Sequence, residues 1–289
     1  MCTEEAARVA VVTDSCACIP ERLVRELSIL TVPLTIRFGA ESFLDGVELT
    51  AQEFYQRLRH CRELPKTSQP TPEQFLDAFR QAAEKARSVV CITMSGALSG
   101  TANAARVAAS MLTNATVEVV DSLTATFCEG LLVLDAARQA ALGAGLRDIV
   151  DRVQSLRPKV HLFAVLDTLD YLVRGGRVGK TAALAGSLLN IKPIITFDRD
   201  GEVASLGKVR TLPRALDRIR SLVEEHVAPG ERLHVGIMDA DAEEAARELG
   251  QKVQEQFDCA EVHYVPVSPV IGTYAGPGAL GVAVFAASE

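Results

Sequence analysis

Short runs of apolar residues recur along this chain of 289 residues, and segments with a helical spacing of apolar side chains separate several of them. Alternation of strand and helix is typical of α/β proteins with parallel strands. The predicted strands cover residues 8–13, 29–38, 88–93, 116–120, 161–166, 192–197, 203–209, 233–238, 261–267 and 281–285. The predicted helices cover residues 102–112, 129–142, 212–226 and 242–257, and Gly143 is placed to end the second of them.

The second half of the chain departs from this regular alternation. The strands at residues 192–197 and 203–209 follow one another closely, and Asp200-Gly201 between them is a strong hairpin turn. We therefore predict an α/β protein of two domains. Residues 1–160 form an N-terminal domain with a parallel sheet, and residues 161–289 form a C-terminal domain with a mixed or antiparallel sheet and covering helices.

The charge and the apolar runs exclude several classes of protein. The chain carries 30 basic and 37 acidic residues, no tryptophan and no run of basic residues, which argues against a nucleic-acid-binding protein. No apolar stretch is long enough to cross a membrane, and the acidic N-terminal segment does not resemble a signal peptide. We expect a cytoplasmic protein.

The cysteines predict neither a disulfide scaffold nor a metal site. Seven cysteines are present, and Cys16 and Cys18 form a C-x-C pair without a second pair at zinc spacing. Reduced thiols of a cytosolic protein are the simpler interpretation. We expect no bound metal and no cofactor.

Polar residues follow three of the early strands. Asp14-Ser15, Ser95 and Asp121-Ser122 each come directly after an apolar run. The carboxyl ends of parallel strands meet at one edge of a sheet, where ligands bind. These side chains therefore either share one edge of a site or cap the helices that follow.

The segment ITMSGALSGTANAA, at residues 92–105, raises the question of a nucleophile. Its glycines do not frame Ser95 or Ser99 in the spacing of a nucleophile elbow, and none of the five histidines stands in an obvious position to act as a base. The segment RGGRVGKT at residues 174–181 lacks the glycine spacing and the preceding strand of a phosphate-binding loop. We therefore expect neither a serine hydrolase nor nucleotide hydrolysis.

An anion site at a helix terminus is the remaining interpretation of this segment. Ser99, Gly100 and Thr101 come directly before the helix predicted from residue 102, and unpaired N–H groups at a helix N-terminus favour an anion. Simple capping of that helix by Ser99 is the alternative. A second hydroxyl cluster, KTSQPTPE at residues 66–73, contains Thr71 as the cap of another helix and leaves Thr67 and Ser68 unassigned.

Taken together, these segments resemble the DegV family, the fatty-acid-binding group whose members serve as the binding subunit of bacterial fatty acid kinase. The resemblance covers nearly the whole chain. It rests on VVTDS (11–15), VPLTIRF with FLDG (32–46), PKTSQPTPEQF (65–75), SGALSGTANAA (95–105), VVDS (119–122), LDTLDYLVRGGRVGK (166–180), LLNIKPI (188–194), GKVRT (207–211) and GPGALGV (276–282).

The resemblance implies that one long-chain fatty acid lies in a tunnel between two α/β domains. A separate fatty acid kinase would phosphorylate the bound carboxylate to an acyl phosphate, and lipid exchange would involve only peripheral membrane contact. Carried over to this sequence, the carboxylate-binding residues are Thr67, Ser68, Ser95, Ser99, Gly100 and Tyr274. Arg174, Arg177 and Arg210 would meet the kinase or the phosphoryl group.

Two positions depart from the family pattern. Tyr274 stands where the family usually has histidine, two residues before the GPG motif. A tyrosine hydroxyl donates a hydrogen bond but does not shuttle protons near neutral pH, so lipid binding should tolerate this change better than phosphoryl transfer. Cys16 and Cys18 replace the more usual threonine and aspartate. A lipid-binding regulatory protein without a kinase partner is one alternative function, and a serine-dependent acyl hydrolase is another.

Overall fold

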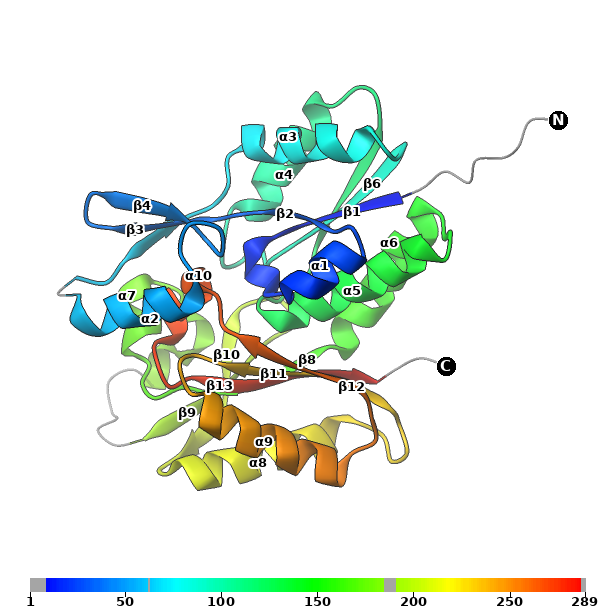
Figure 1. The fold of residues 1–289 in the computed structure, drawn as a ribbon. Helices are drawn as coiled ribbons and strands as arrows, with labels where there is room; N and C mark the ends of the chain where they lie inside the picture. Colours follow the sequence, from blue (N-terminus) through cyan, green and yellow to red (C-terminus); the bar gives the residue numbers. More distant parts are fainter. Residues whose placement is uncertain (1–8, 62, 185–190, 287–289) are drawn as a thin grey trace.

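The computed structural model describes residues 9–61, 63–184 and 191–286. Residues 188–190, which belong to one of the segments shared with the DegV family, lie outside this description. The described residues form a four-stranded, a three-stranded and a six-stranded sheet, with helices between and around them (Figure 1).

The four-stranded sheet is parallel throughout, with the strand order β2-β1-β6-β7. Its strands are β1 (Val9–Asp14), β2 (Leu30–Val32), β6 (Ser88–Thr93) and β7 (Thr116–Asp121). Apolar side chains cover both faces of β1 and β6, because helices bury the sheet from both sides. These helices are α1 (Glu21–Glu26), α3 (Pro72–Ala83), α4 (Thr101–Met111), α5 (Phe127–Ala141) and α6 (Leu146–Leu156).

The predicted strand at residues 29–38 is wrong as a single element. Pro33 separates β2 from β3 (Thr35–Phe38), and the two strands belong to different sheets. Proline donates no backbone hydrogen bond, so it interrupts the ladder there. The three-stranded sheet β4-β3-β5 adds β4 (Glu41–Leu44) and β5 (Lys66–Ser68), which are short, largely polar strands that the apolar pattern does not reveal.

The six-stranded sheet is mixed, with the order β10-β9-β8-β13-β11-β12. Only β11 and β12 pair in parallel, and the predicted β9–β10 hairpin turns at Gly201, whose φ is +78°. Its strands are β8 (His161–Val165), β9 (Lys192–Phe197), β10 (Val203–Val209), β11 (Leu233–Asp239), β12 (Cys259–Pro266) and β13 (Leu280–Ala286). The predicted fold class, a parallel first sheet followed by a mixed second sheet in an α/β protein, is confirmed. The division of the chain at residue 160 stays a prediction.

The remaining helices lie at the outer face of the second sheet and at one side of the molecule. Helices α8 (Leu212–His226) and α9 (Glu243–Gln256) cover the outer face. Helices α2 (Ala51–His60), α7 (Asp170–Gly175) and α10 (Pro269–Ala275) pack together beside the three-stranded sheet (Figure 1). The short 3₁₀ turns are η1 (Ser15–Ala17), η2 (Arg157–Lys159) and η3 (Gly179–Leu184).

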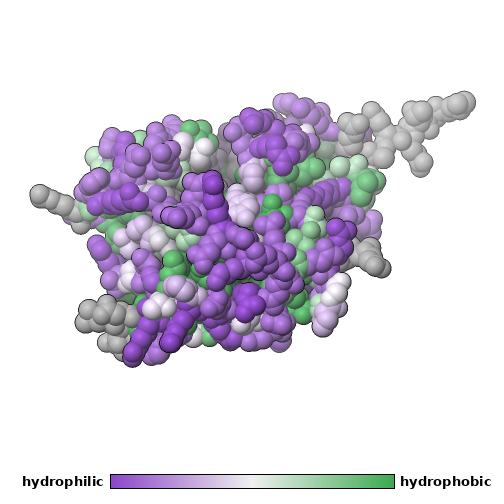
Figure 2. Space-filling model, turned by 60° about the horizontal axis from the view of Figure 1, so that its bottom comes forward, coloured by the Kyte–Doolittle hydropathy of each residue, from purple (hydrophilic) through white to green (hydrophobic). Residues whose placement is uncertain are grey.

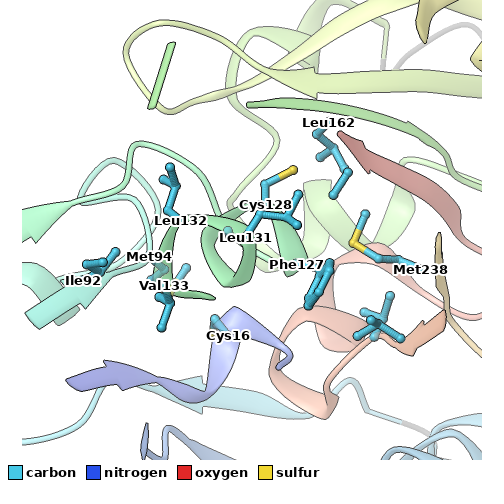
Figure 3. Packing of buried hydrophobic residues seen from close by; sticks show 14 of the residues in the cluster. Cys16, Ile92, Met94, Phe127, Cys128, Leu131, Leu132, Val133, Leu162 and Met238 are labelled. Atoms are coloured by element: carbon cyan, nitrogen blue, oxygen red, sulfur yellow. The ribbon is translucent and has the colours of Figure 1, made fainter. Parts of the chain in front are cut away.

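Helix α5 lies between the first and second sheets and joins their cores. Figure 3 shows Phe127 and Cys128 at its start facing Met238 and Leu162 of the second sheet. Both sheets therefore contribute to one apolar interior. On the face of the molecule in Figure 2, hydrophilic side chains predominate and hydrophobic ones form only small patches. Within the described ranges, no helix combines the length and the apolar character needed to span a bilayer.

Candidate functional site

A cavity of about 290 Å³ opens between the second sheet and the loops of the first. Its walls come from both halves of the chain and are mainly aliphatic. The apolar lining residues are Leu34, Met94, Leu98, Ala125, Leu162, Ala164, Leu166, Leu172, Ile195, Phe197, Val203, Met238, Val267, Val270, Ile271, Ala275, Ala279, Leu280 and Gly281. A concave, largely apolar site with a few polar groups is the usual form of a small-molecule pocket.

Two contacts link three of the polar residues in the cavity wall, Thr67, Tyr274 and Arg177. The polar residues in the walls are Thr67, Ser68, Gln69, Ser99, Thr126, Arg177 and Tyr274. The Thr67 hydroxyl lies 2.6 Å from the Tyr274 hydroxyl, so the last residues of β5 and the last turn of α10 meet at this point. The ring of Tyr274 in turn lies against Arg177. We call Thr67, Ser68, Ser99, Arg177 and Tyr274 the polar end of the cavity.

Ser99 is placed at the start of α4 without serving as its cap. The cap position is Gly100, and no described side chain caps this helix. The Ser99 hydroxyl lies 2.8 Å from the Thr101 hydroxyl, and the first N–H groups of the helix have no intrahelical acceptor. The capping alternative for Ser99 is therefore wrong. The arrangement leaves hydrogen-bond donors that suit an anion.

Arg177 supplies the only formal charge among the described residues that line the cavity. Its Nε donates to the Leu98 carbonyl at 3.2 Å, and its Nη1 donates to the Gly175 carbonyl at 2.9 Å. Its Cζ lies 5.0 Å from the centroid of the Tyr274 ring. These contacts orient the guanidinium without neutralising it, because no carboxylate within the described part of the chain pairs with it. The charge therefore remains available to an anionic ligand.

Tyr274 fits beside Arg177 because position 175 has no side chain. A Cβ atom at Gly175 would lie 2.4 Å from Cδ1 of the Tyr274 ring, closer than carbon atoms approach. Gly175 is the last residue of α7, and Gly176 after it adopts φ of +70° to end the helix. The glycine pair thus lets α7 and α10 approach closely enough for the tyrosine to reach Thr67.

Other predicted residues lie outside the cavity wall. The buried Ser95 hydroxyl donates to the Gly201 carbonyl at 2.9 Å and accepts from the Ala97 amide at 3.2 Å. Its hydroxyl is thus committed to its own loop and to the β9–β10 hairpin. Gly100 lies against the side chain of Gln69 and outside the cavity wall. Arg174 and Arg210 are exposed, and neither belongs to the cavity wall in the part of the chain that the structure describes.

The interpretation of the polar strand ends as one shared edge of a site is wrong. Asp14 accepts from the amides of Cys16 and Met94, both at 2.9 Å, and burial raises its pKa to about 6. Asp121 accepts from the amides of Gly96 and Leu123. These carboxylates hold the loops after β1, β6 and β7 in shape and do not line the cavity.

Gln69 and Thr126 line the cavity although the sequence pattern did not single them out. Gln69 follows Ser68 directly, and its side-chain amide lies against Gly100, so its place beside a hydroxyl cluster was the available signal. Thr126 precedes α5 and carries no such signal.

No group of three or more metal-ligating side chains was found in residues 9–61, 63–184 and 191–286. The geometry accordingly offers hydrogen-bond donors and one cation to a ligand with an apolar body and an anionic head.

Known proteins resemble this chain over nearly its whole length. The family model described as "Uncharacterised protein, DegV family" matches residues 8–287. A DegV domain-containing protein of Caldanaerobacter subterraneus subsp. tengcongensis is 36% identical over 275 residues, which cover 95% of this chain and 98% of the relative.

Two solved structures share the fold over nearly their whole length. One, described as showing fatty acid binding of a DegV family protein from Thermus thermophilus, has a TM-score of 0.92 and 31% identity, covering 97% of this chain and 100% of that one. The other is a stearic acid-binding protein from Eubacterium ventriosum, with a TM-score of 0.86 and 26% identity, covering 96% and 98%. The chain described here belongs to the DegV family.

Proposed function

We propose that this protein binds one long-chain fatty acid, with the acyl chain in the apolar cavity and the carboxylate at its polar end. This proposal rests on one cavity of about 290 Å³ whose described lining combines nineteen apolar residues with one cation, Arg177, for which no described carboxylate is a partner. Similar proteins from Thermus thermophilus and Eubacterium ventriosum are described as binding fatty acids, which supports the same conclusion.

The energetics of such a ligand match the two parts of the site. Each methylene moved from water into apolar surroundings contributes about 0.8 kcal/mol, so a chain of about sixteen carbons contributes on the order of 12 kcal/mol before the costs of association. A carboxylate leaving water requires charge-assisted hydrogen bonds in exchange. Thr67, Ser99 and the Arg177 guanidinium are the donors that would supply them.

Native mass spectrometry of the delipidated protein tests this proposal. After addition of stearic acid, the spectrum should show one added ligand per chain, and octadecane should give no stable adduct. Replacing Ala164, a small residue in the cavity wall, by phenylalanine should fill the cavity and abolish the adduct. Replacing the exposed Ala141 by phenylalanine is the matched control. Failure of the wild-type protein to take up any fatty acid would refute the proposal.

The finer proposal is that the protein presents the carboxylate to a separate ATP-dependent fatty acid kinase. The polar end supports it, because Ser68 and Gln69 are exposed, so the head of a bound ligand would lie near solvent. Arg174, an exposed residue close in sequence to Arg177, would contact the kinase or the phosphoryl group, and Arg210 is a further candidate. Incubating the loaded protein with the kinase and ATP, and trapping acyl phosphate with hydroxylamine, tests this step directly.

The hydrolase alternative requires a base beside the serine nucleophile. The chain has five histidines, and none of them lines the cavity in the part of the chain that the structure describes. A regulatory protein that binds the lipid without a kinase has the same binding site, and absence of acyl phosphate in the trapping assay would favour it.

A further inference from the structure

Asp45 is a buried carboxyl group that contacts two parts of the cavity wall, at Leu34 and at Val270. It is only 2% exposed, and it follows β4 in the segment FLDG. Its Oδ2 accepts from the Ser15 hydroxyl at 2.7 Å, and its backbone N–H donates to the Leu34 carbonyl at 2.9 Å. The Ser15 hydroxyl also accepts from the Leu34 amide at 3.1 Å. Leu34 lines the cavity, so Asp45 holds this wall from behind.

The other oxygen of Asp45 faces α10. Its Oδ1 accepts from the Val270 amide at 3.4 Å, and the Ser268 side chain also lies beside this carboxylate. Val270 and Ile271 line the cavity, and the same helix carries Tyr274 to Thr67. Asp45 follows β4 of the three-stranded sheet, whereas Ser15 follows β1 of the four-stranded sheet. Asp45 thus connects the first turn of α10 with the turn after β1.

Among the residues that the structure describes, no cation compensates the buried charge. The titratable groups that face Asp45 are Asp14 at the end of β1, Cys16 and Cys18 around η1, and Tyr55 of α2. All of them are acids, so the Ser15 hydroxyl, the Ser268 side chain and the Val270 amide are what favours the ionised form. Burial raises the pKa of Asp45 to about 7. Such a group changes its charge in the range where proteins work.

We propose that Asp45 is a positioning residue for the polar end of the cavity: its carboxylate docks α10 against Ser15 and so sets Tyr274 opposite Thr67. The ionised carboxylate accepts hydrogen bonds from all its donors at once. In the protonated form one oxygen carries a hydrogen and is itself a donor, so it faces groups that also donate. Ionised Asp45 therefore favours the binding conformation, and acyl affinity rises with pH through neutrality. This inference rests on the proposed fatty-acid site.

The variant Asp45→Asn, which imitates the protonated form, tests the inference. The ratio of wild-type to variant affinity for stearic acid should be within about twofold at pH 6 and approach about tenfold at pH 8, if ionisation contributes a tenfold coupling. The ligand carboxyl group ionises equally in the experiments with both proteins, so its effect on affinity cancels in this ratio. Ser15→Ala withdraws a donor from the carboxylate and should shift the midpoint of the wild-type profile upward by about one pH unit.

Glu129→Gln is the matched control, since Glu129 is a buried carboxyl group that accepts a hydrogen bond from Thr13 and lies outside the cavity wall as described. Its affinity ratio to wild type should not vary with pH. In the absence of ligand, the peptide that contains α10 should exchange its amide hydrogens faster in Asp45→Asn than in wild type at pH 8. A ratio for Asp45→Asn that stays constant from pH 6 to pH 8, or unchanged exchange in α10, would overturn the inference. Absence of acyl binding by the wild-type protein would instead refute the proposed function.

Discussion

The hydroxyl groups of Thr67 and Tyr274 lie 2.6 Å apart, although the two residues are 207 positions apart in the sequence. Thr67 lies on β5, a short edge strand of the three-stranded sheet. Tyr274 lies on α10, the helix that precedes β13 of the six-stranded sheet. The contact closes the polar end of an otherwise apolar cavity. If Tyr274 donates to Thr67, the Thr67 proton is free to reach a ligand carboxylate.

Removing the tyrosine hydroxyl should weaken acyl binding while leaving the fold intact. In Tyr274→Phe, the Thr67 hydroxyl loses its hydrogen-bond partner. One such hydrogen bond contributes about 0.5–1.5 kcal/mol, so the affinity should fall roughly two- to tenfold. Isothermal titration with stearic acid measures it. Tyr264→Phe, at an exposed tyrosine of β12, is the control and should bind as wild type does. Equal affinities for all three proteins would show that the contact has no part in binding.

A side chain at position 175 should disturb both stability and binding. In Gly175→Ala the new Cβ would meet the Tyr274 ring at 2.4 Å, and overpacking of this kind costs about 1–3 kcal/mol. Urea unfolding should show a lower midpoint, and the affinity for fatty acid should fall with the displacement of Tyr274. Gly145→Ala, before α6 and away from the cavity, should change neither quantity by much. Wild-type behaviour of Gly175→Ala would mean that α7 and α10 are not held at this distance.

The charge of Arg177 should matter for anionic ligands and not for neutral ones. Arg177→Gln removes a cation that has no carboxylate partner within the described residues, so stearic acid should bind about tenfold or more weakly, and the salt dependence of binding should decrease. The methyl ester of stearic acid should bind both proteins alike. Arg106→Gln, at an exposed position of α4, is the control. An equal loss for acid and ester would indicate a structural role for Arg177.

The long apolar strands were predictable because their pattern is local. Strands β1, β6 and β11 consist of nearly continuous apolar runs, which only a sheet buried on both faces accommodates. Strand β5 was not predictable, because three largely polar residues gain their extended form from pairing with β3. The break at Pro33 separates two strands that read as one apolar run.

The cavity was predictable from the family resemblance but not from the apolar pattern. Leu34, Leu166 and Val267 are as apolar as the residues of the solid core, and only the assembled fold leaves space beside them. The roles of Thr67 and Ser99 stay predictions, although the structure places both in the cavity wall. The commitment of Ser95 to Gly201 depends on a contact across 106 positions, which no local pattern reveals.

Stability should fall as the pH rises from about 5 to 8. Burial raises the pKa of Asp14 to about 6 and that of Glu129 well above its usual value, so the folded state binds protons that the unfolded state releases. The stabilising contribution of such a group is complete below its unfolded pKa and is lost as the pH rises through the folded pKa.

Urea unfolding across this pH range measures the effect. Glu129→Gln removes one titrating proton and should reduce the slope by up to about 1.4 kcal/mol per pH unit. Glu84→Gln, at an exposed carboxyl group, should retain the wild-type slope. A wild-type stability that rises steadily from pH 5 to 8 would contradict the assignment of these groups as buried acids whose desolvation outweighs their hydrogen bonds.

A crystal structure of the delipidated protein after incubation with stearic acid would show where the ligand lies. One acyl chain should occupy the cavity bounded by Leu166, Val203 and Met238. Its carboxylate should lie about 3 Å from the Thr67 and Ser99 hydroxyls, on the side that holds Arg177. An empty cavity, or a chain whose carboxylate lies away from these hydroxyls, would contradict the proposed binding site.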